Sequence, residues 1–213
     1  MGSAIFNDQD SKNLESLGYI ADKLSQLKEI NGKPNLRAIF YDERGNLRTS
    51  FTDNSGNEIP GLKEFAQRID GNKESFKSVL DGAKYEFSEL NSDNGFKAAV
   101  FKDLDSGAVI TAIAGTDIKD PGDIINDAQM VNNNTPSQYA TLESLYNKLK
   151  ENKDVNQESG IYVVGHSLGG SLGQLLAINK IEDGYIKGVK TFEPYGIKEI
   201  IKSNPELLVH YII

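Results

Sequence analysis

The segment IYVVGHSLGG, residues 161–170, decides the fold of this chain. Four residues that favour a buried strand run directly into Gly-x-Ser-x-Gly, and an amphipathic helical segment follows at 171–181. This order of strand, tight turn and helix is what a nucleophile elbow requires, because the serine must stand clear of the sheet on a strained turn. The segment therefore makes Ser167 the candidate nucleophile.

The residues beside Ser167 fit the same interpretation. A Cβ at Gly165 or Gly169 would collide with a neighbouring strand or helix, so glycine is the residue type that the turn needs. The helix that starts beside the serine favours negative charge there, through its free N–H groups and its dipole. The alternative is a glycine-rich turn between strand and helix, in which Ser167 only caps the helix.

These residues resemble the class 3 lipase family of α/β-hydrolases. The segment GHSLGG, residues 165–170, is the family's elbow as usually written, and a second match lies upstream, where 96–117 reads as a hairpin ending in IAGTD. The family has aromatic-Arg-Gly-Ser/Thr at that strand end and a short segment closing on Asp, here 123–127. Ala114 stands where the family usually has Arg, and Ile113 where it often has Phe. The resemblance covers about half the chain, Phe96 to Gly196.

Acyl transfer needs two N–H groups aimed at the developing oxyanion. One donor is expected to be the backbone N–H of Leu168, the residue after the nucleophile. The resemblance implies that the other is Thr116, although a residue at a strand end can also serve only the turn. The same resemblance implies an α/β-hydrolase fold and a lipid or other carboxylic ester as the substrate.

The histidine base and the acid are less clearly marked. In α/β-hydrolases the acid and then the histidine follow the serine, and His210 is the one histidine after Ser167. It lies in 207–213, which reads as a strand interior, so it is either the base or a strand residue. Glu193 is the candidate acid, or else shapes the pocket floor, whereas His166 is expected to support the elbow. The resemblance implies an acid and a histidine beyond the last strand, so the hydrolase core is expected to be incomplete at its C-terminus.

Composition excludes several other classes of function. The net charge of −8 argues against nucleic acid and against docking on anionic membranes, but not against neutral lipid. The chain has no cysteine and two histidines, so we expect no disulfide, no metal site and no cofactor. It has no apolar run long enough to span a membrane, and we expect no Sec-type leader at its N-terminus unless one has already been removed. The acidity and the Asn/Asp/Gly turns suit an exported bacterial lipase, with a cytoplasmic location left open.

The N-terminal part reads as a helix, a hairpin and further helices. Apolar residues at spacings of three and four predict a helix between Asp10 and Gly32, either packed on the domain or acting as a mobile lid or partner-binding helix. Strands are predicted at 36–41 and 47–52, and helices follow at 61–69 and 73–80. We assign residues 1–90 to this N-terminal extension and 91–213 to the hydrolase core.

From residue 96 onward, strands alternate with helices. Strands are predicted at 96–102, 108–114, 188–192 and 207–213 in addition to the elbow strand, and helices at 139–149 and 197–203. Alternation of this kind predicts an α/β fold, an α/β-hydrolase core with a mostly parallel sheet flanked by helices. The apolar strand 207–213 would form a sheet edge, which predicts a homo-oligomer paired through it.

Two functions from different classes remain. The first is a serine ester hydrolase of lipase or phospholipase type. The second is a non-catalytic hydrolase-fold module that binds or packs through its elbow, or an inactive fragment of a lipase.

Overall fold

The computed structural model describes residues 7–27, 36–80, 84–93, 95–115, 138–153, 155–194 and 197. Within these ranges five strands form one sheet in the order β1-β2-β3-β4-β5. The strands are β1 Tyr85–Asp93, β2 Phe96–Asp103, β3 Val109–Ile113, β4 Ile161–His166 and β5 Ile186–Phe192. The helices are α1 Asp8–Gly18, α2 Ala21–Leu24, α3 Leu36–Phe40, α4 Leu62–Gly71, α5 Lys73–Leu80, α7 Gln138–Glu151, α8 Ser167–Asn179 and the short 3-10 helix η1 Ile181–Asp183.

The sheet is mixed rather than mostly parallel. β1 pairs antiparallel with β2 and β2 with β3, and β3, β4 and β5 then run parallel. The predicted hairpin between 96 and 114 is confirmed. The predicted mostly parallel sheet is only partly right, because β1 was not predicted and pairs antiparallel with β2. The chain is therefore of the α/β class, with the parallel part of its sheet around β4.

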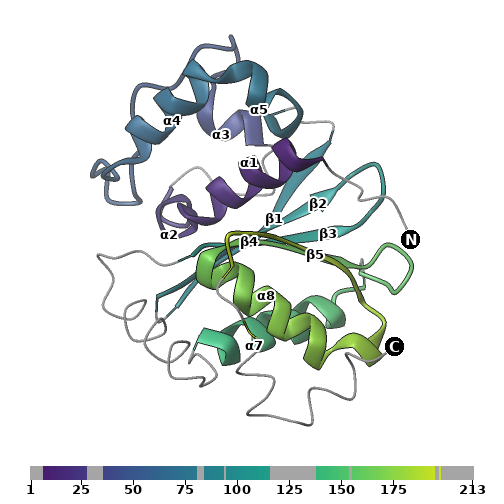
Figure 1. Ribbon diagram of the computed structural model, residues 1–213. Coiled ribbons are helices and arrows are strands. Elements are labelled where there is room, and N and C mark those ends of the chain that lie inside the picture. Colours follow the sequence, from purple (N-terminus) through teal and green to yellow (C-terminus); the bar gives the residue numbers. More distant parts are fainter. Residues whose placement is uncertain are drawn as a thin grey trace.

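Helices cover both faces of the sheet (Figure 1). α1 to α5 lie over one face and α7 with α8 over the other. Two hydrophobic clusters correspond to these layers, and both include sheet residues. The cluster on the N-terminal side takes these side chains from the sheet: Tyr85, Ala99, Phe101, Ile110, Ala112 and Val164. The division at residue 90 stays a prediction, and this cluster contains residues from both sides of it.

β3 illustrates why the parallel strands are apolar throughout. Ile110 and Ala112 belong to the cluster with the N-terminal helices, whereas Val109 and Ile113 belong to the cluster with α7 and α8. Successive side chains of a strand point to opposite faces, so a strand covered on both faces needs apolar residues at every position. This double burial holds β4 between two helical layers and so fixes where the turn after it begins.

The predicted N-terminal helix is interrupted. α1 begins at Asp8, and the side chain of Asn7 accepts a hydrogen bond from the Asp10 N–H at 2.7 Å as its cap. The helix ends at Gly18, and α2 starts three residues later at Ala21. The start is therefore earlier than the predicted Asp10, and the break was not predicted. The apolar face is packed on the sheet within the described part.

The strand predicted at 36–41 is wrong, because 36–40 is helix α3. Leu36, Ile39 and Phe40 are buried at helical spacing, a pattern that a short segment shares with a strand. The strand predicted at 47–52 is also wrong, because only two isolated bridges, Tyr41↔Leu47 and Thr52↔Glu58, form there.

Two loops of the same design close these bridges. In each, an aspartate carboxylate accepts hydrogen bonds from backbone N–H groups two and four residues later, Asp42 from Arg44 and Asn46, and Asp53 from Ser55 and Asn57. These hydrogen bonds stabilise both turns within the chain itself.

Several predicted elements lie outside the described residues. They are the closing segment 123–127, most of the helix 197–203 and the strand 207–213, with the oligomer interface that this strand would form. No helix in the described ranges is long and apolar enough to cross a membrane.

Candidate active site

The candidate site is built at the junction of β4 and α8. β4 ends at His166 and α8 begins at Ser167, whose backbone φ is +51°. An L-residue with a side chain rarely adopts this left-handed conformation, which costs about 1–2 kcal/mol. The strained turn places Ser167 at the carboxyl end of the parallel strands, where α/β sheets bind ligands.

Gly165 and Gly169 allow the strand and helix to approach closely. A Cβ on Gly165 would lie 2.5 Å from the carbonyl carbon of Gly169, and a Cβ on Gly169 would lie 2.5 Å from the carbonyl oxygens of Ile113 and Ala114. These are backbone atoms, which cannot rotate away as a side chain can. The two glycines therefore pack the first turn of α8 against β4 and the end of β3.

His166 is held on both sides of its ring. The Tyr19 hydroxyl lies 3.2 Å from its Nδ1, and Glu193 Oε2 lies 3.6 Å from its Nε2. The Glu193 side chain is 89% exposed, so water screens its interaction with the imidazole. The residue itself has a φ of +46°, which turns the chain sharply after β5. Glu193 thus lies beside His166 at the carboxyl end of the sheet.

Tyr19 is a site residue that sequence reasoning missed. A Cβ on Gly115 would lie 2.6 Å from the Tyr19 hydroxyl and 3.1 Å from Ser167 Cβ, so the hydroxyl reaches the space beside the serine. Gly18 makes this reach possible, because a Cβ there would lie 2.8 Å from the Ala112 carbonyl oxygen of β3. Nothing local in the sequence marks Tyr19, since its contacts come from β3 and β4.

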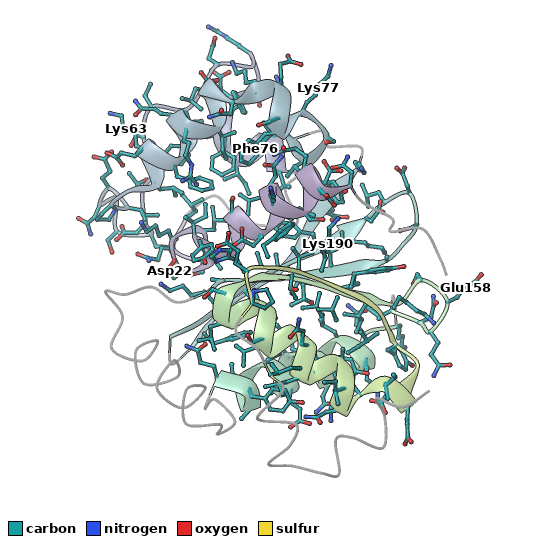
Figure 2. All side chains as sticks on the ribbon, viewed as in Figure 1. Asp22, Lys63, Phe76, Lys77, Glu158 and Lys190 are labelled. Atoms are coloured by element: carbon teal, nitrogen blue, oxygen red, sulfur yellow. The ribbon has the colours of Figure 1, made fainter. Side chains whose placement is uncertain are left out.

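The end of α1 and the start of α8 thus lie at the same end of the sheet, beside the carboxyl ends of β3 and β4. The nearby Asp22 carboxylate is 3.9 Å from the ammonium of Lys97 on β2, whose carbonyl accepts a hydrogen bond from the Ala114 N–H. In Figure 2, Asp22 is labelled at the end of the sheet where α8 begins.

The predicted oxyanion donors can be located only in part. Leu168 lies in the first turn of α8, with its side chain buried in the cluster with α7 and its N–H at the helix start. Thr116 and the candidate base His210 both lie outside the described residues. The arrangement around Ser167 therefore brings together Leu168, His166, Glu193 and the unpredicted Tyr19.

A pocket of about 580 Å³ lies between α1–α2 and α4, with Tyr19 in its wall. Its lining consists of Glu15, Ser16, Tyr19, Ile20, Lys23, Gly61, Glu64, Phe65 and Arg68. Glu15 is 9% exposed, and its Oε1 is buried without a hydrogen-bond partner among the described residues. Burial raises the pKa of Glu15 to about 7, against the opposing charge of Arg68. The pocket thus combines charges of both signs with apolar walls.

In the described ranges, no group of three or more His, Cys, Asp or Glu side chains could hold a metal ion.

Comparison with known families identifies the segment that carries this site. Residues 105–195 match the model of the family described as Lipase (class 3), a range that contains β3, β4, β5, the helices between them and Ser167. Comparison with curated proteins and with solved structures gave no match. The resemblance stated for the segment GHSLGG is confirmed, and a class 3 lipase is in general a hydrolase of lipid esters. Over residues 105–195, which include the candidate nucleophile, the chain is class 3 lipase-like.

Proposed function

We propose that this chain is a serine ester hydrolase that acts on lipid or other carboxylic esters, with Ser167 as the nucleophile. The observation that carries the proposal is the backbone of Ser167, a non-glycine residue at φ +51° between a buried strand and a helix. Strain of this kind persists where the surrounding structure imposes it, and it clusters at functional sites. The class 3 lipase match over 105–195 supports the same chemistry.

The proposed reaction proceeds through an acyl-enzyme. The Ser167 Oγ attacks the ester carbonyl carbon while a histidine takes the hydroxyl proton, and the carbonyl oxygen becomes an oxyanion. Collapse of this intermediate breaks the bond to the alcohol, which leaves with the proton, and water then releases the acid in the same way. The Leu168 N–H and Thr116 would hold the oxyanion, and loss of one such donor costs on the order of a hundredfold in rate.

The proposed base is His210, and Glu193 is the proposed acid. Histidine is the side chain best suited to this role, because its ordinary pKa lies near neutrality. His166 is the other histidine of the chain, and its contacts with Tyr19 and Glu193 suit a positioning role. We assign it to holding the turn rather than to proton transfer.

A fluorophosphonate probe with intact-mass detection tests the proposal. The probe phosphonylates a serine only where its hydroxyl is activated, so stoichiometric labelling at Ser167 is expected, and its loss in Ser167→Ala. Ser159→Ala, in the turn before β4, is the matched control and should label like the wild type. His210→Gln then tests the base, with labelling expected to fall at least a hundredfold.

Absence of labelling at Ser167 in the folded chain would contradict the proposal. Folding is monitored independently by circular dichroism and urea denaturation of the same samples. The non-catalytic module would then be the better description of this chain.

A further inference from the structure

The pocket between α1–α2 and α4 lies next to the candidate nucleophile. Tyr19 connects the two, because it lines the pocket and its hydroxyl contacts His166. Neither α1 nor α4 belongs to the segment that matches the lipase family. The pocket is thus contributed by the N-terminal layer, while the serine comes from the segment below it.

One carboxyl group that lines this pocket has an oxygen atom without a hydrogen-bond donor among the described residues. Glu15 is more than nine-tenths buried, yet its Oε1 accepts no hydrogen bond from any described residue. A buried carboxyl atom left without a partner costs on the order of 1–3 kcal/mol. Ile20 and Phe65, which also line the pocket, are buried and apolar, so a molecule bound there can supply the donor that Glu15 lacks among the described residues.

The rim carries two cations. Lys23 lines the pocket from α2, and Arg68 lines it from α4 with its guanidinium 4.7 Å from the centre of the Phe65 ring. Stacking on an aromatic ring restricts an arginine and leaves its N–H edge available for a planar or tetrahedral anion. Glu64 adds a second carboxylate at the exposed rim.

We propose that this pocket binds the polar end of the ester substrate, and that this polar end joins an ammonium group to a phosphate, as in a zwitterionic phospholipid. The ammonium lies at Glu15 and the phosphate at Lys23 and Arg68. The acyl ester then extends past Tyr19 toward Ser167. This assignment rests on the proposed function, which it deepens by naming the substrate class.

A ligand of single charge fits the lining less well. An anion alone would satisfy Lys23 and Arg68 but would leave the buried carboxyl of Glu15 without a donor. An ammonium alone would satisfy Glu15 but would leave Lys23 and Arg68 without an anionic ligand, since Glu64 offsets only one of their two charges. A zwitterion whose charges lie a few ångströms apart satisfies both ends of the pocket, and charge complementarity of this kind gives specificity.

Binding of phosphoethanolamine to the Ser167→Ala protein, measured by titration calorimetry, tests the proposal without any hydrolysis. Inorganic phosphate and ethanolamine are titrated separately. Phosphoethanolamine is expected to bind at least about tenfold more tightly than either. If inorganic phosphate binds as tightly as phosphoethanolamine, the pocket is a simple anion site and the zwitterion assignment falls.

Two substitutions connect binding to the pocket. Glu15→Gln and Arg68→Gln are each expected to weaken phosphoethanolamine binding about tenfold or more, by removing one charged partner. The controls are Glu74→Gln on α5 and Lys63→Gln on α4, which make the same charge changes outside the pocket; Lys63 is labelled in Figure 2. Equal weakening in the controls would overturn the assignment.

Hydrolysis separates a lipid head group from a free metabolite. Two soluble substrates are compared, a short-chain phosphatidylethanolamine and tributyrin. Arg68→Gln should lower kcat/KM for the phospholipid about tenfold and leave tributyrin unchanged, because tributyrin has no charged end. Equal loss on both esters, or loss on neither while phosphoethanolamine binding weakens, contradicts the head-group assignment.

The outcomes distinguish this proposal from the proposed function. Selective phosphoethanolamine binding without fluorophosphonate labelling would contradict Ser167 as nucleophile and leave the pocket assignment standing. Labelling at Ser167 without selective binding would contradict the pocket assignment alone.

Discussion

The hydroxyl of Tyr19 lies 3.2 Å from Nδ1 of His166, although 147 residues separate them along the chain. This hydrogen bond joins the end of α1 to the residue before the candidate nucleophile. Tyr19→Phe removes the hydroxyl and keeps the ring. We expect fluorophosphonate labelling of Ser167 to slow about tenfold, because small displacements of a reacting group are costly.

Tyr146→Phe is the matched control for Tyr19→Phe. It removes a hydroxyl that donates to Asp183 at 3.1 Å in the opposite helical layer. Both variants should lose a similar amount of stability in urea, about 1 kcal/mol, but only Tyr19→Phe should slow labelling. Equal labelling rates in the two variants would show that Tyr19 has only a structural role.

Ser167→Gly should stabilise the fold while abolishing labelling. Glycine adopts φ +51° without the penalty that a Cβ carries, so the free energy of unfolding should rise by about 1 kcal/mol. Ser167→Ala keeps the Cβ and should leave stability nearly unchanged. Urea denaturation of the wild type and the two variants measures these stabilities. If Ser167→Gly is no more stable than Ser167→Ala, the backbone at Ser167 is not strained.

Gly165→Ala should be strongly destabilising, by 3 kcal/mol or more in order of magnitude, because its Cβ would meet Gly169 backbone atoms at 2.5 Å. Gly71→Ala is the control, since a Cβ there meets nothing within 4 Å and Gly71 ends helix α4. Alanine at Gly71 should stabilise the chain by about 0.5–1 kcal/mol. Thermal denaturation should therefore move in opposite directions for the two alanines.

Glu15→Gln should become more stabilising as the pH rises. Burial raises the pKa of Glu15 to about 7 from an ordinary value of 4.5, so the folded state disfavours the charge. This penalty is absent below pH 4.5, grows between 4.5 and 7, and approaches roughly 3 kcal/mol above 7. Glutamine carries no charge and avoids it.

Urea denaturation at pH 5 and pH 8 measures this effect. The gap between Glu15→Gln and the wild type should widen at the higher pH, whereas exposed Glu74→Gln should give the same small difference at both. A gap of constant size would mean that Glu15 has no raised pKa in the folded chain.

Asp10→Asn should destabilise the fold at neutral pH. Asp10 is fully buried and accepts hydrogen bonds from the Lys84 ammonium at 2.8 Å, from the Tyr85 hydroxyl at 3.1 Å and from Ser78. Burial alone would raise the pKa of Asp10, but these hydrogen bonds outweigh it and hold the pKa below its usual value. The ionised carboxylate therefore joins α1 to α5 and β1.

The expected loss is about 3 kcal/mol at pH 7. Because a depressed pKa stabilises the folded state only above the unfolded value, the difference should shrink as the pH falls below about 4. Asp8→Asn is the control, since Asp8 is 83% exposed. If the loss of unfolding free energy in Asp10→Asn is equally large in acid, the carboxylate of Asp10 is not ionised in the folded chain.

The elements predictable from sequence are those whose signal is local. β3, β4 and α8 were predicted because each is a continuous apolar or amphipathic run beside a turn of defined residue type. β1 was missed because its sequence, YEFSELNSD, lacks such a run and its partner supplies the pairing. α3 was misread because five residues cannot separate a period of two from one of 3.6.

The candidate site divides in the same way. Ser167, Leu168 and the two glycines follow from one short motif, so sequence could predict them. Tyr19 and Glu15 could not be predicted, because their roles depend on α1 crossing β3 at Gly18, a contact between segments about ninety residues apart. Long-range packing of this kind leaves no periodic trace in the sequence.

The pocket is lined by the N-terminal helices, whereas Ser167 begins α8 on the other face of the sheet, and this separation has an evolutionary consequence. α4 contributes to the wall of the pocket and lies outside the lipase-like segment, so on the proposed assignment substitutions along α4 change which molecule binds without disturbing the turn at Ser167. α1 is more constrained, since Glu15 lies in it and Tyr19 directly follows it, and these two residues line the pocket while Tyr19 also contacts His166. On the proposed assignment, substrate preference should therefore diverge through substitutions in α4 rather than in α1.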